Sequence, residues 1–577
     1  MTEQTSKPSF FVARHYFVLT VLVALFIALL GRAAYLQVFN QQFLLGEGSQ
    51  RQLRTIETAA YRGTIFDRFG NPLAISTPVD SVWVNPKIIL QDMPGLKKVT
   101  KTLGLDFKKT VNKLKQRLNR EFVFVKRRVQ PELAQQAVGG IKGAYLQREY
   151  NRFYPAGEVV AHVIGFTDID GKGREGLELI YQDSLKARPG KRKILRNRKG
   201  EVVEEIAQVE AAVAGQDLTT SIDMRLQYIA YRSLAQALKK YHAKSGSAVL
   251  LDAHNGEVLA IISLPSYNPN KAKNNAAGRR RNRAITDIFE PGSTIKPFTL
   301  AAALDQGLFS DKSIINTAPG YMKVTGYPVR DFRNYGKLDL AGILRKSSNV
   351  GAAKVALSMP ADAMWKSFNR YGFGEDTGVS FPAASSGYLS FFGDWHPLDQ
   401  ATLAFGYGIS VSVLQLARSY AIFANEGKLA PLSLLKVAQQ PQAQQVMKPA
   451  TAKLVLQMME QVVGPGGTAK QAAIKGYRVA GKTGTVKKNG AGGYLEDTYS
   501  AVFAGIAPVS NPRLVMAVMV DEPDREIGYY GGEVAAPVFR DVMTQALRLM
   551  NVSPDNPQQI STLAMHVNGS QSRKGEL

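Results

Sequence analysis

An uncharged apolar run near the N-terminus constrains this chain most, because such a run is poorly tolerated in water. Residues 16–30 read YFVLTVLVALFIALL. At about 1.5 Å per residue, a helix of this length covers about 22 Å, which is short of the roughly 30 Å hydrocarbon core of a bilayer. The apolar pattern resumes after Arg32, whose long side chain can reach the interface, so we expect a membrane-spanning helix over residues 16–39. The alternative is a cleaved signal peptide, for which Gly31 and Ala33 offer a weak cleavage site.

The charges around this run give a modest orientation signal. Lys7 and Arg14 precede it, but Arg51 and Arg54 follow it. We expect a single-pass protein of the cytoplasmic (inner) membrane, with a short cytoplasmic tail at residues 1–15 and the body outside. This orientation depends mainly on the short tail and on the function argued below.

The remaining chain has the composition of folded protein. With 577 residues, 45% hydrophobic and 21% charged, it is too long for one core, and we expect several domains. The absence of cysteine excludes disulfides, thiolate catalysis and cysteine zinc sites. The six histidines are scattered and form no H-E-x-x-H pair, so we expect neither a metal nor a cofactor.

Positive charge dominates, with 72 basic against 47 acidic residues and a net charge of +25. Basic residues concentrate at 108–128, 191–199 and 271–283. Such runs suit attraction to a polyanion, which could be nucleic acid, lipid head groups or an anionic wall polymer. No nucleic-acid-binding module surrounds them, so we expect no nucleic-acid partner.

Residues 40–216 show a mixed pattern of strands and loops with one helical stretch, at 107–118. Short apolar runs between turn residues at 60–74 predict strands, and residues 191–205 predict a β-hairpin that turns at Lys199-Gly200. We interpret this region as a mainly-β pedestal, because it contains no cluster of chemistry-bearing residues.

Residues 217–552 form a second predicted block. Apolar strands are expected at 247–251, 257–262, 499–506 and 514–520, and helices at 226–241, 413–424 and 451–462. Strands at both ends with helices between them predict one α+β domain. The polar tail at 553–577 is expected to be disordered.

One S-x-x-K tetrad, Ser293 to Lys296 within EPGSTIKP, has the chemistry of a nucleophile beside its base. If a helix starts here, the two side chains share one face of its first turn. A desolvated lysine near other cations could be neutral near pH 7 and deprotonate the serine. The helix N-terminus would offer N–H groups to a developing oxyanion, and Pro297 is tolerable in a first turn.

The tetrad alone is weak, because about two are expected by chance in a chain this long. A second one occurs at Ser433 to Lys436. Serine enzymes of this type also need an S-x-N and a later K-T-G strand. Ser347-Ser348-Asn349 and Lys482-Thr483-Gly484-Thr485 follow Ser293 in that order, whereas no serine lies between Lys436 and Lys482.

With these motifs in place, the chain resembles the class B penicillin-binding proteins of the division-specific, penicillin-binding protein 3 type. The segments PGSTIKPF, KSSNVG, FGYGISVSVLQLARSYAIFANEG, AIKGYRVAGKTGT and YYGGEVAAPVF carry the resemblance in the second block, and RGTIFDRFGNPLA, YPAGEVVAHVIG and GREGLE carry it in the pedestal. It covers about residues 40 to 550. It implies an α+β fold: an N-terminal membrane helix, a pedestal or dimerisation-type module at 40–216, and a serine β-lactamase-like transpeptidase domain with a central antiparallel sheet at 217–552.

The resemblance also implies residue roles in a peptidoglycan D,D-transpeptidase that cross-links the septal wall. Ser293 would attack the D-Ala-D-Ala stem peptide, with Lys296 as general base. Ser347 would pass a proton to the leaving group, helped by Lys482. The substrate-binding group would be Asn349, Thr483, Gly484 and Thr485, with the N–H groups of Ser293 and Thr485 as the oxyanion hole.

The implied partners are stem peptides, a lipid-linked precursor polymer and β-lactam inhibitors. No glycosyltransferase domain is seen, so a membrane glycosyltransferase of the shape, elongation, division and sporulation family is implied, with other divisome membrane proteins. The alternatives are the elongation-specific paralogue, a D,D-carboxypeptidase or β-lactamase-like hydrolase, and a non-catalytic sensor. The tail before Tyr16 is too short for a signalling domain, which argues against the sensor.

Overall fold

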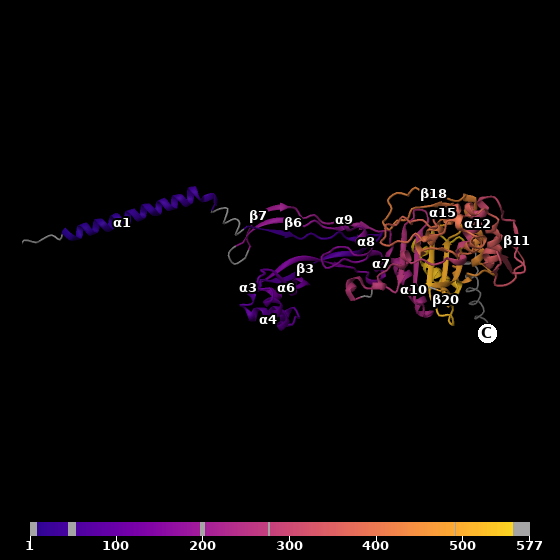
Figure 1. Ribbon diagram of the computed structural model, residues 1–577, viewed down its shortest axis with the longest axis horizontal. Helices are drawn as coiled ribbons and strands as arrows, with labels where there is room; N and C mark the ends of the chain where they lie inside the picture. Colours follow the sequence, from indigo (N-terminus) through magenta and orange to yellow (C-terminus); the bar gives the residue numbers. More distant parts are fainter. Residues whose placement is uncertain (1–8, 44–52, 197–201, 275–276, 491, 558–577) are drawn as a thin grey trace, which may run out of the picture. The chain divides into compact units, whose positions relative to one another are not determined.

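The computed structural model describes residues 9–43, 53–196, 202–274, 277–490 and 492–557 (Figure 1). The chain separates into two compact units. The first contains Met1–Tyr61 and Ala187–Ala214, and the second contains Arg62–Lys186 and Gly215–Leu577. The candidate chemistry belongs entirely to the second unit.

The first unit begins with a long apolar helix. Helix α1 (Ser9–Ala34) continues into one π-helical turn at Tyr35–Phe39. Within it, Val12–Phe39 is long and apolar enough to cross a membrane, and its large apolar side chains are exposed. The helix expected at 16–39 is therefore present, and it starts earlier than expected, at Ser9.

The same unit contains a three-stranded antiparallel sheet, in the order β1 (Leu53–Thr58), β6 (Gly190–Arg196) and β7 (Val202–Glu210). Pairing of β6 with β7 confirms the predicted hairpin. Its predicted turn at Lys199-Gly200 lies outside the described residues.

In the second unit, the pedestal is built around the long strand β3 (Pro72–Val84). It pairs antiparallel with β2 (Ile65–Phe66), β4 (Val123–Val129) and β5 (Ala144–Phe153), while β8 (Leu218–Thr219) pairs parallel with β2. Val82 and Val84 enter a hydrophobic core, whereas Trp83 between them stacks on Tyr145 with ring centroids 4.4 Å apart. This alternation places helices on only one face of the sheet.

The expectation of a single helical stretch in residues 40–216 is wrong. Helix α5 (Phe107–Lys115) is the predicted one, but α4 (Met93–Thr102) packs beside it, and α6 (Pro131–Val138) packs against α4. Both carry proline in the first turn, where a missing N–H costs nothing. The further single-turn helices are α3 (Pro86–Ile89), α7 (Ala161–Ile164), α8 (Gly176–Ile180) and α9 (Gln182–Leu185).

A five-stranded antiparallel sheet forms the centre of the remaining residues, in the order β10-β9-β21-β20-β19. The strands are β9 (Ser245–Asp252), β10 (Val258–Leu264), β19 (Ala480–Gly490), β20 (Gly493–Ala507) and β21 (Leu514–Asp521). Early and late strands meet where β9 pairs with β21. This pairing confirms the predicted α+β domain with strands from both ends of the block.

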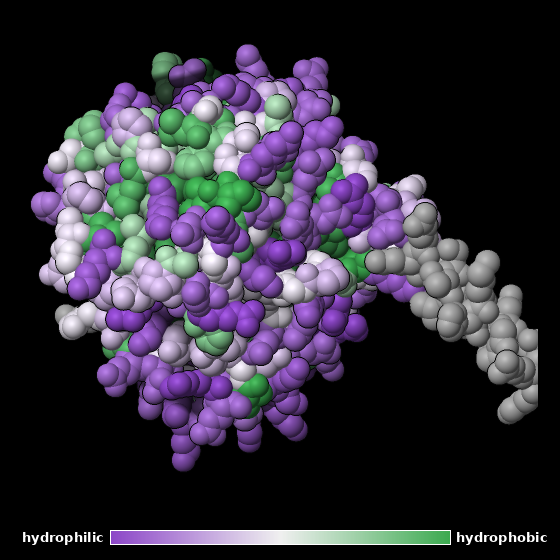
Figure 2. Space-filling view, turned by 90° about the vertical axis from the view of Figure 1, so that its right-hand side faces the viewer, coloured by the Kyte–Doolittle hydropathy of each residue, from purple (hydrophilic) through white to green (hydrophobic). Residues whose placement is uncertain are grey.

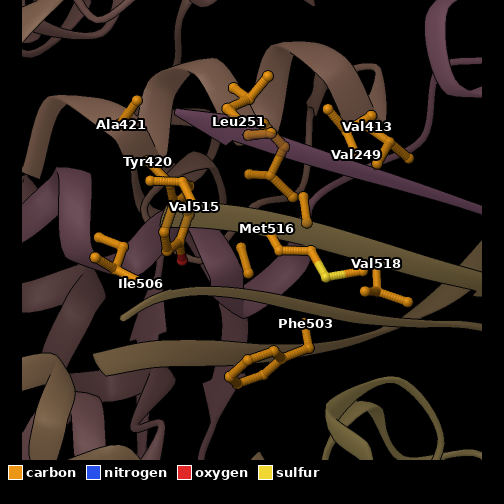
Figure 3. Packing of buried hydrophobic residues seen from close by; sticks show 14 of the residues in the cluster. Val249, Leu251, Val413, Tyr420, Ala421, Phe503, Ile506, Val515, Met516 and Val518 are labelled. Carbon is orange, nitrogen blue, oxygen red and sulfur yellow. The ribbon is translucent and has the colours of Figure 1, made fainter. Parts of the chain in front are cut away.

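Helices cover both faces of this sheet. On one face, α10 (Met224–Lys240) and α19 (Gly531–Leu549) pack, and Phe503 of β20 meets Phe539 at a centroid distance of 4.9 Å. On the other, α17 (Val413–Ala424) lies across the strands and directs Tyr420 toward Ile506 and Val515 (Figure 3). Helix α18 (Pro449–Val463) packs beside β19. The predicted helices at 226–241, 413–424 and 451–462 are confirmed.

The segment between β10 and β19 carries shorter elements. Its other helices are α11 (Arg283–Thr286), α12 (Lys296–Asp305), α13 (Leu340–Lys346), α14 (Asn349–Leu357), α15 (Ala361–Arg370) and α16 (Pro397–Leu403). Its strands pair as β11 (Ile314–Asn316) with β14 (Lys337–Asp339), β12 (Tyr321–Val324) with β13 (Tyr327–Arg330), β15 (Tyr388–Leu389) with β16 (Ile409–Ser410), and β17 (Lys428–Leu429) with β18 (Gln444–Gln445).

Strand β19 is the edge of the central sheet, because it pairs there only with β20. An edge strand keeps one row of backbone N–H and C=O groups for another extended chain. Much of the surface seen in Figure 2 is hydrophilic, and most of its apolar residues lie in the upper part of the view.

The first residues of the tail differ from the expectation of disorder after 553. Asp555 accepts hydrogen bonds from the backbone N–H groups of Arg478 (2.7 Å) and Ser510 (3.0 Å). This acidic residue therefore holds the start of the tail on the domain. Residues 558–577 lie outside the described residues.

Candidate active site

Ser293 lies on a 3₁₀ turn at Gly292–Ile295, and α12 begins directly after it at Lys296. The predicted helix start is thus a tighter turn, yet it still brings the pair together: Lys296 Nζ lies 3.0 Å from Ser293 Oγ. Gly292 has a φ of +53°, and a side chain there would collide with Val486 of β19. Glycine therefore allows the nucleophile turn to press against the edge strand.

The Lys296 side chain is fully buried among oxygen atoms. Its Nζ donates to the Ser347 carbonyl at 2.6 Å and to Asn349 Oδ1 at 2.8 Å. The hydroxyl oxygens of Ser293 and Ser347 lie 3.0 and 3.1 Å away. A neutral amine has two hydrogens, which match the two acceptor-only oxygens, and its lone pair is then available to the Ser293 hydroxyl.

Electrostatics favour that neutral amine. Burial and the neighbouring Lys482 cation lower the pKa of Lys296 well below its ordinary value, while Asp331 acts in the opposite direction. Desolvation disfavours the charged form of a lysine, and a like charge adds to the effect. Lys296 can therefore accept a proton near neutral pH.

Ser347 lies between the two lysines. It adopts a left-handed conformation, with φ of +57°, at the junction of α13 and α14. This geometry points its hydroxyl toward both amines, at 3.1 Å from Lys296 Nζ and 3.0 Å from Lys482 Nζ. Such a hydroxyl can both donate and accept, so it can relay a proton.

Lys482 comes from β19, which confirms the strand predicted around K-T-G. Its side chain is fully buried, and burial lowers its pKa to about 7. Thr483 and Thr485 lie two residues apart on one face of β19. Thr483 Oγ1 lies 2.8 Å from Thr468 Oγ1, and Thr485 Oγ1 accepts from the Gly531 N–H at 3.0 Å.

Gly484 lies where β19 meets the nucleophile turn. A side chain there would crowd the Pro291 carbonyl oxygen at 2.8 Å. The three sequence motifs therefore converge: Ser293, Lys296, Ser347, Asn349 and Lys482 form one chain of contacts, and the K-T-G strand flanks it. The catalytic role of each residue remains a prediction.

Comparison with protein families matches two regions of the chain. Residues 246–544 match the penicillin binding protein transpeptidase domain, and residues 57–220 match the penicillin-binding protein dimerisation domain. The chain belongs to the penicillin-binding transpeptidase family.

Relatives in this family are similar over nearly the full chain. The probable peptidoglycan D,D-transpeptidase PbpC of Pseudomonas aeruginosa is 40% identical over 96% of this chain and 98% of its own. The peptidoglycan D,D-transpeptidase FtsI of Escherichia coli is 41% identical over 91% of this chain and 90% of its own.

Solved structures of the penicillin-binding family are similar as well. The transpeptidase domain of penicillin-binding protein 3 from Burkholderia pseudomallei is 42% identical, covers 58% of this chain and 97% of its own, and has a TM-score of 0.54. A peptidoglycan synthetase from Bifidobacterium adolescentis is 26% identical, covers 88% of this chain and 98% of its own, and has a TM-score of 0.70.

Sequence reasoning missed Asp331, which contacts residues of this candidate site. Its carboxylate accepts hydrogen bonds from the backbone N–H groups of Asn349 (2.5 Å) and Val350 (2.9 Å), and from the Ser348 hydroxyl (2.6 Å). Ser348 in turn caps α14 by accepting from the Gly351 N–H, which gives it a structural role. Asp331 had no sequence signal, because it lies outside all three motifs.

Two further contacts of the nucleophile turn were also missed. Gly406, in the sequence FGYG, contacts the nucleophile turn directly: its carbonyl accepts from the Gly292 N–H at 3.2 Å. The Glu290 carboxylate accepts from the Tyr494 hydroxyl at 3.0 Å and from the Gly408 N–H at 2.9 Å. The FGYG sequence could have indicated a tight turn, but it could not have indicated that this turn contacts the one that carries Ser293.

Proposed function

We propose that this chain is a peptidoglycan D,D-transpeptidase that forms an acyl-enzyme on Ser293. One observation carries the proposal: the buried Lys296 amine contacts Ser293, Ser347 and Asn349 at once. This arrangement joins the proposed nucleophile, proton relay and substrate amide holder through a single base. Resemblance to the family supplies the substrate, a stem peptide that ends in D-Ala-D-Ala.

The proposed reaction has two acyl transfers. Lys296 takes the hydroxyl proton as Ser293 Oγ forms an ester with the penultimate D-Ala carbonyl. The peptide C–N bond breaks, and a proton passes through Ser347, with Lys482 nearby, to the departing amine of D-Ala. An amine of a neighbouring stem then attacks the ester and gives up its proton. This step forms the cross-link and regenerates the Ser293 hydroxyl.

Substrate binding uses the edge strand. The donor would lie along β19, where Asn349 holds its amide and Thr483 and Thr485 bind its terminal carboxylate. The N–H groups of Ser293 and Thr485 would receive the oxyanion. Lys482 adds positive charge in a dry site, where electrostatic interactions are stronger than in water.

The apolar N-terminal helix fits a single-pass membrane anchor. We propose that its N-terminus is cytoplasmic and that the transpeptidase domain lies on the outer side, in the periplasm. A fusion reporter that is active only outside the cytoplasm should work at the C-terminus and fail at the N-terminus. The reverse result would refute this orientation.

We propose division as the cellular role, with a membrane glycosyltransferase of the shape, elongation, division and sporulation family as a partner. Small and aromatic residues on the anchor (Ala24, Ala28, Gly31, Tyr35) offer a face for another membrane helix. Replacing the anchor with an unrelated apolar helix should preserve β-lactam binding but abolish division. Depletion should give unseptated filaments, whereas round swollen cells would indicate the elongation role.

Persistence of the acyl-enzyme separates transfer from hydrolysis. Class A β-lactamases activate water with a glutamate in an E-x-x-L-N stretch, and no E-x-x-L-N occurs between Asn349 and Lys482. Intact-mass measurement after penicillin treatment should show one adduct on the peptide that contains Ser293, lasting many minutes after free drug is removed. Loss within seconds, with excess hydrolysed penicillin, would establish a hydrolase.

A further inference from the structure

The helix α5 and the turn after it form a strongly basic segment, residues 107–122, that the proposed reaction does not use. No Asp or Glu lies between Asp106 and Glu121. Asp106 caps α5 by accepting from the Lys109 N–H at 2.7 Å, and Glu121 pairs with Lys87. In the described part of the chain no salt bridge involves the basic side chains of this segment, which are Lys108, Lys109, Lys113, Lys115, Arg117 and Arg120.

The basic side chains stand on the solvent side of the helix. Val111 and Leu114 are buried in the pedestal core, whereas the four lysines of α5, at 108, 109, 113 and 115, are all exposed, with Lys109 and Lys113 on the half opposite the core. The neighbouring α4 adds exposed lysines at 97, 98 and 101. A folded domain gains nothing from crowding like charges in this way, because they repel one another.

Apolar side chains lie among these charges instead of in the core. Leu118 and Phe122, in the turn after α5, are 47% and 41% exposed, with Arg117 and Arg120 beside them. A cleft of about 260 Å³ between α5 and β4 is lined by the part-exposed apolar side chains of Leu105 and Phe124 together with Lys109, Lys113 and Asp106. Cations interleaved with exposed apolar groups are typical of a surface that meets lipid head groups and the upper acyl region.

From these features we propose that the basic segment docks on the surface of anionic phospholipid in the membrane that holds the chain's own anchor. The inference depends on the anchor proposed above and not on the acyl-transfer chemistry. The second unit begins at Arg62, and the span ends at Phe39. The connecting chain, fully extended, reaches at most about 80 Å. This tether keeps the segment at a high effective concentration next to the bilayer.

Docking would limit the orientations that the pedestal can take on its tether. Each basic residue near an anionic surface contributes about a fivefold factor in the docking equilibrium. Six of them on one segment suffice for a stable contact at physiological ionic strength, and high salt weakens it. An acidic protein segment is the competing occupant, and the experiment separates the two.

The absence of native cysteine permits a direct test with the full-length chain. Gln116→Cys, in the turn after α5, is labelled with an environment-sensitive fluorophore and reconstituted in nanodiscs whose lipids carry bromine quenchers in their acyl chains. We expect quenching in nanodiscs rich in phosphatidylglycerol, and its loss in pure phosphatidylcholine and at high salt. The same label at Leu133→Cys, an exposed position on α6, should remain unquenched.

Charge reversal provides the matched comparison. Lys108→Glu with Lys109→Glu and Lys115→Glu should reduce the docked population at least 100-fold. Reversal of the exposed Lys453, Lys470 and Lys475 should leave it unchanged. Both variants should still be acylated by penicillin, which shows that the domain is folded. Both should also elute with the nanodiscs, which shows that the anchor is inserted.

Two outcomes would overturn the proposal. One is equal quenching at position 116 in neutral and anionic nanodiscs, which would show contact without charge recognition. The other is no quenching in anionic nanodiscs while the α5 charge reversal abolishes division in cells. That second result would assign the basic segment to an acidic protein partner.

Discussion

The two S-x-x-K tetrads of this chain have the same pattern and opposite environments. At Ser293 the tetrad lies on a 3₁₀ turn entering a helix, with its lysine buried against the serine hydroxyl. At Ser433 the chain is extended: the serine hydroxyl bonds the Leu435 carbonyl, and Lys436 reaches away to the Arg68 carbonyl. The reactivity of the serine therefore depends on burial and on neighbouring groups. The S-x-x-K sequence alone does not make a serine reactive.

Replacing each of the two serines separately with alanine is the strongest test of this difference. Ser293→Ala should fold normally and form no penicillin adduct, because the Ser293 hydroxyl lies beside the Lys296 amine, whereas the Ser433 hydroxyl bonds the Leu435 carbonyl. Ser433→Ala should label like the wild type. Intact-mass measurement after penicillin treatment reads both, and an adduct on Ser293→Ala would remove Ser293 as the nucleophile.

The two lysines should differ almost as much. Lys296→Arg keeps a positive charge but cannot act as a base near neutral pH, so acylation should fall by a factor of about 10² to 10⁴. Lys436→Arg should have no effect, because Lys436 is exposed. Stopped-flow acylation by a chromogenic β-lactam measures both. Near-wild-type acylation by Lys296→Arg would rule out the lysine-base mechanism.

Asp331 differs from Glu257, the carboxylate at the second tetrad, which accepts from the Val437 N–H and pairs with Arg68. Asp331→Asn removes a charged acceptor from two backbone N–H groups and should slow acylation about 10- to 100-fold. Asp331 also raises the pKa of Lys296, so the variant should reach its active form at lower pH. The cap variant Asp339→Asn is the control, since asparagine caps α13 equally well. An unshifted pH profile would limit Asp331 to a purely structural role.

The smallest effect concerns pH. The pKa of Lys482 is about 7, so raising the pH above this value removes its positive charge. The second-order acylation rate constant should then fall about tenfold per pH unit, while deprotonation of Lys296 produces a rising limb at lower pH. The two amines share Ser347, so the measured values belong to the pair. Lys482→Arg should abolish the falling limb, and a wild-type profile without that limb would contradict the assignment.

The sequence predicted those candidate-site residues whose type is restricted by the chemistry of the reaction. Nucleophile, relay and strand lysine occur in a required order, and this order distinguished Ser293 from Ser433. The strands of the central sheet and helices α10, α17 and α18 followed from strong apolar periodicity, whereas α13 to α16 and the long helix α19 were not predicted. Asp331 was not predicted, because a single acidic residue that accepts hydrogen bonds from backbone N–H groups far along the chain produces no local sequence pattern.

Pedestal helices were missed for a different reason. Helix α4 begins with Met93-Pro94-Gly95, residues that usually indicate a loop, and its cap Asp92 has the same ambiguity. Tertiary packing of Leu96 and Val99 against the pedestal sheet settles the conformation. Short helices depend on such contacts more than on propensity, so local sequence gives little warning of them.

The two buried amines also affect how much further change the chain can tolerate. A buried lysine whose pKa is lowered destabilises the fold near neutral pH, because the unfolded chain binds the proton more tightly than the folded chain does. For Lys482 this penalty shrinks as the pH rises from about 7 toward the ordinary lysine pKa of about 10.4, so thermal stability should increase over that range. Methionine at position 296 should give an inactive but more stable protein. The buried lysines therefore lower the free energy of unfolding before any further substitution is made. Variants with a changed drug-binding surface should need stabilising substitutions elsewhere in the core.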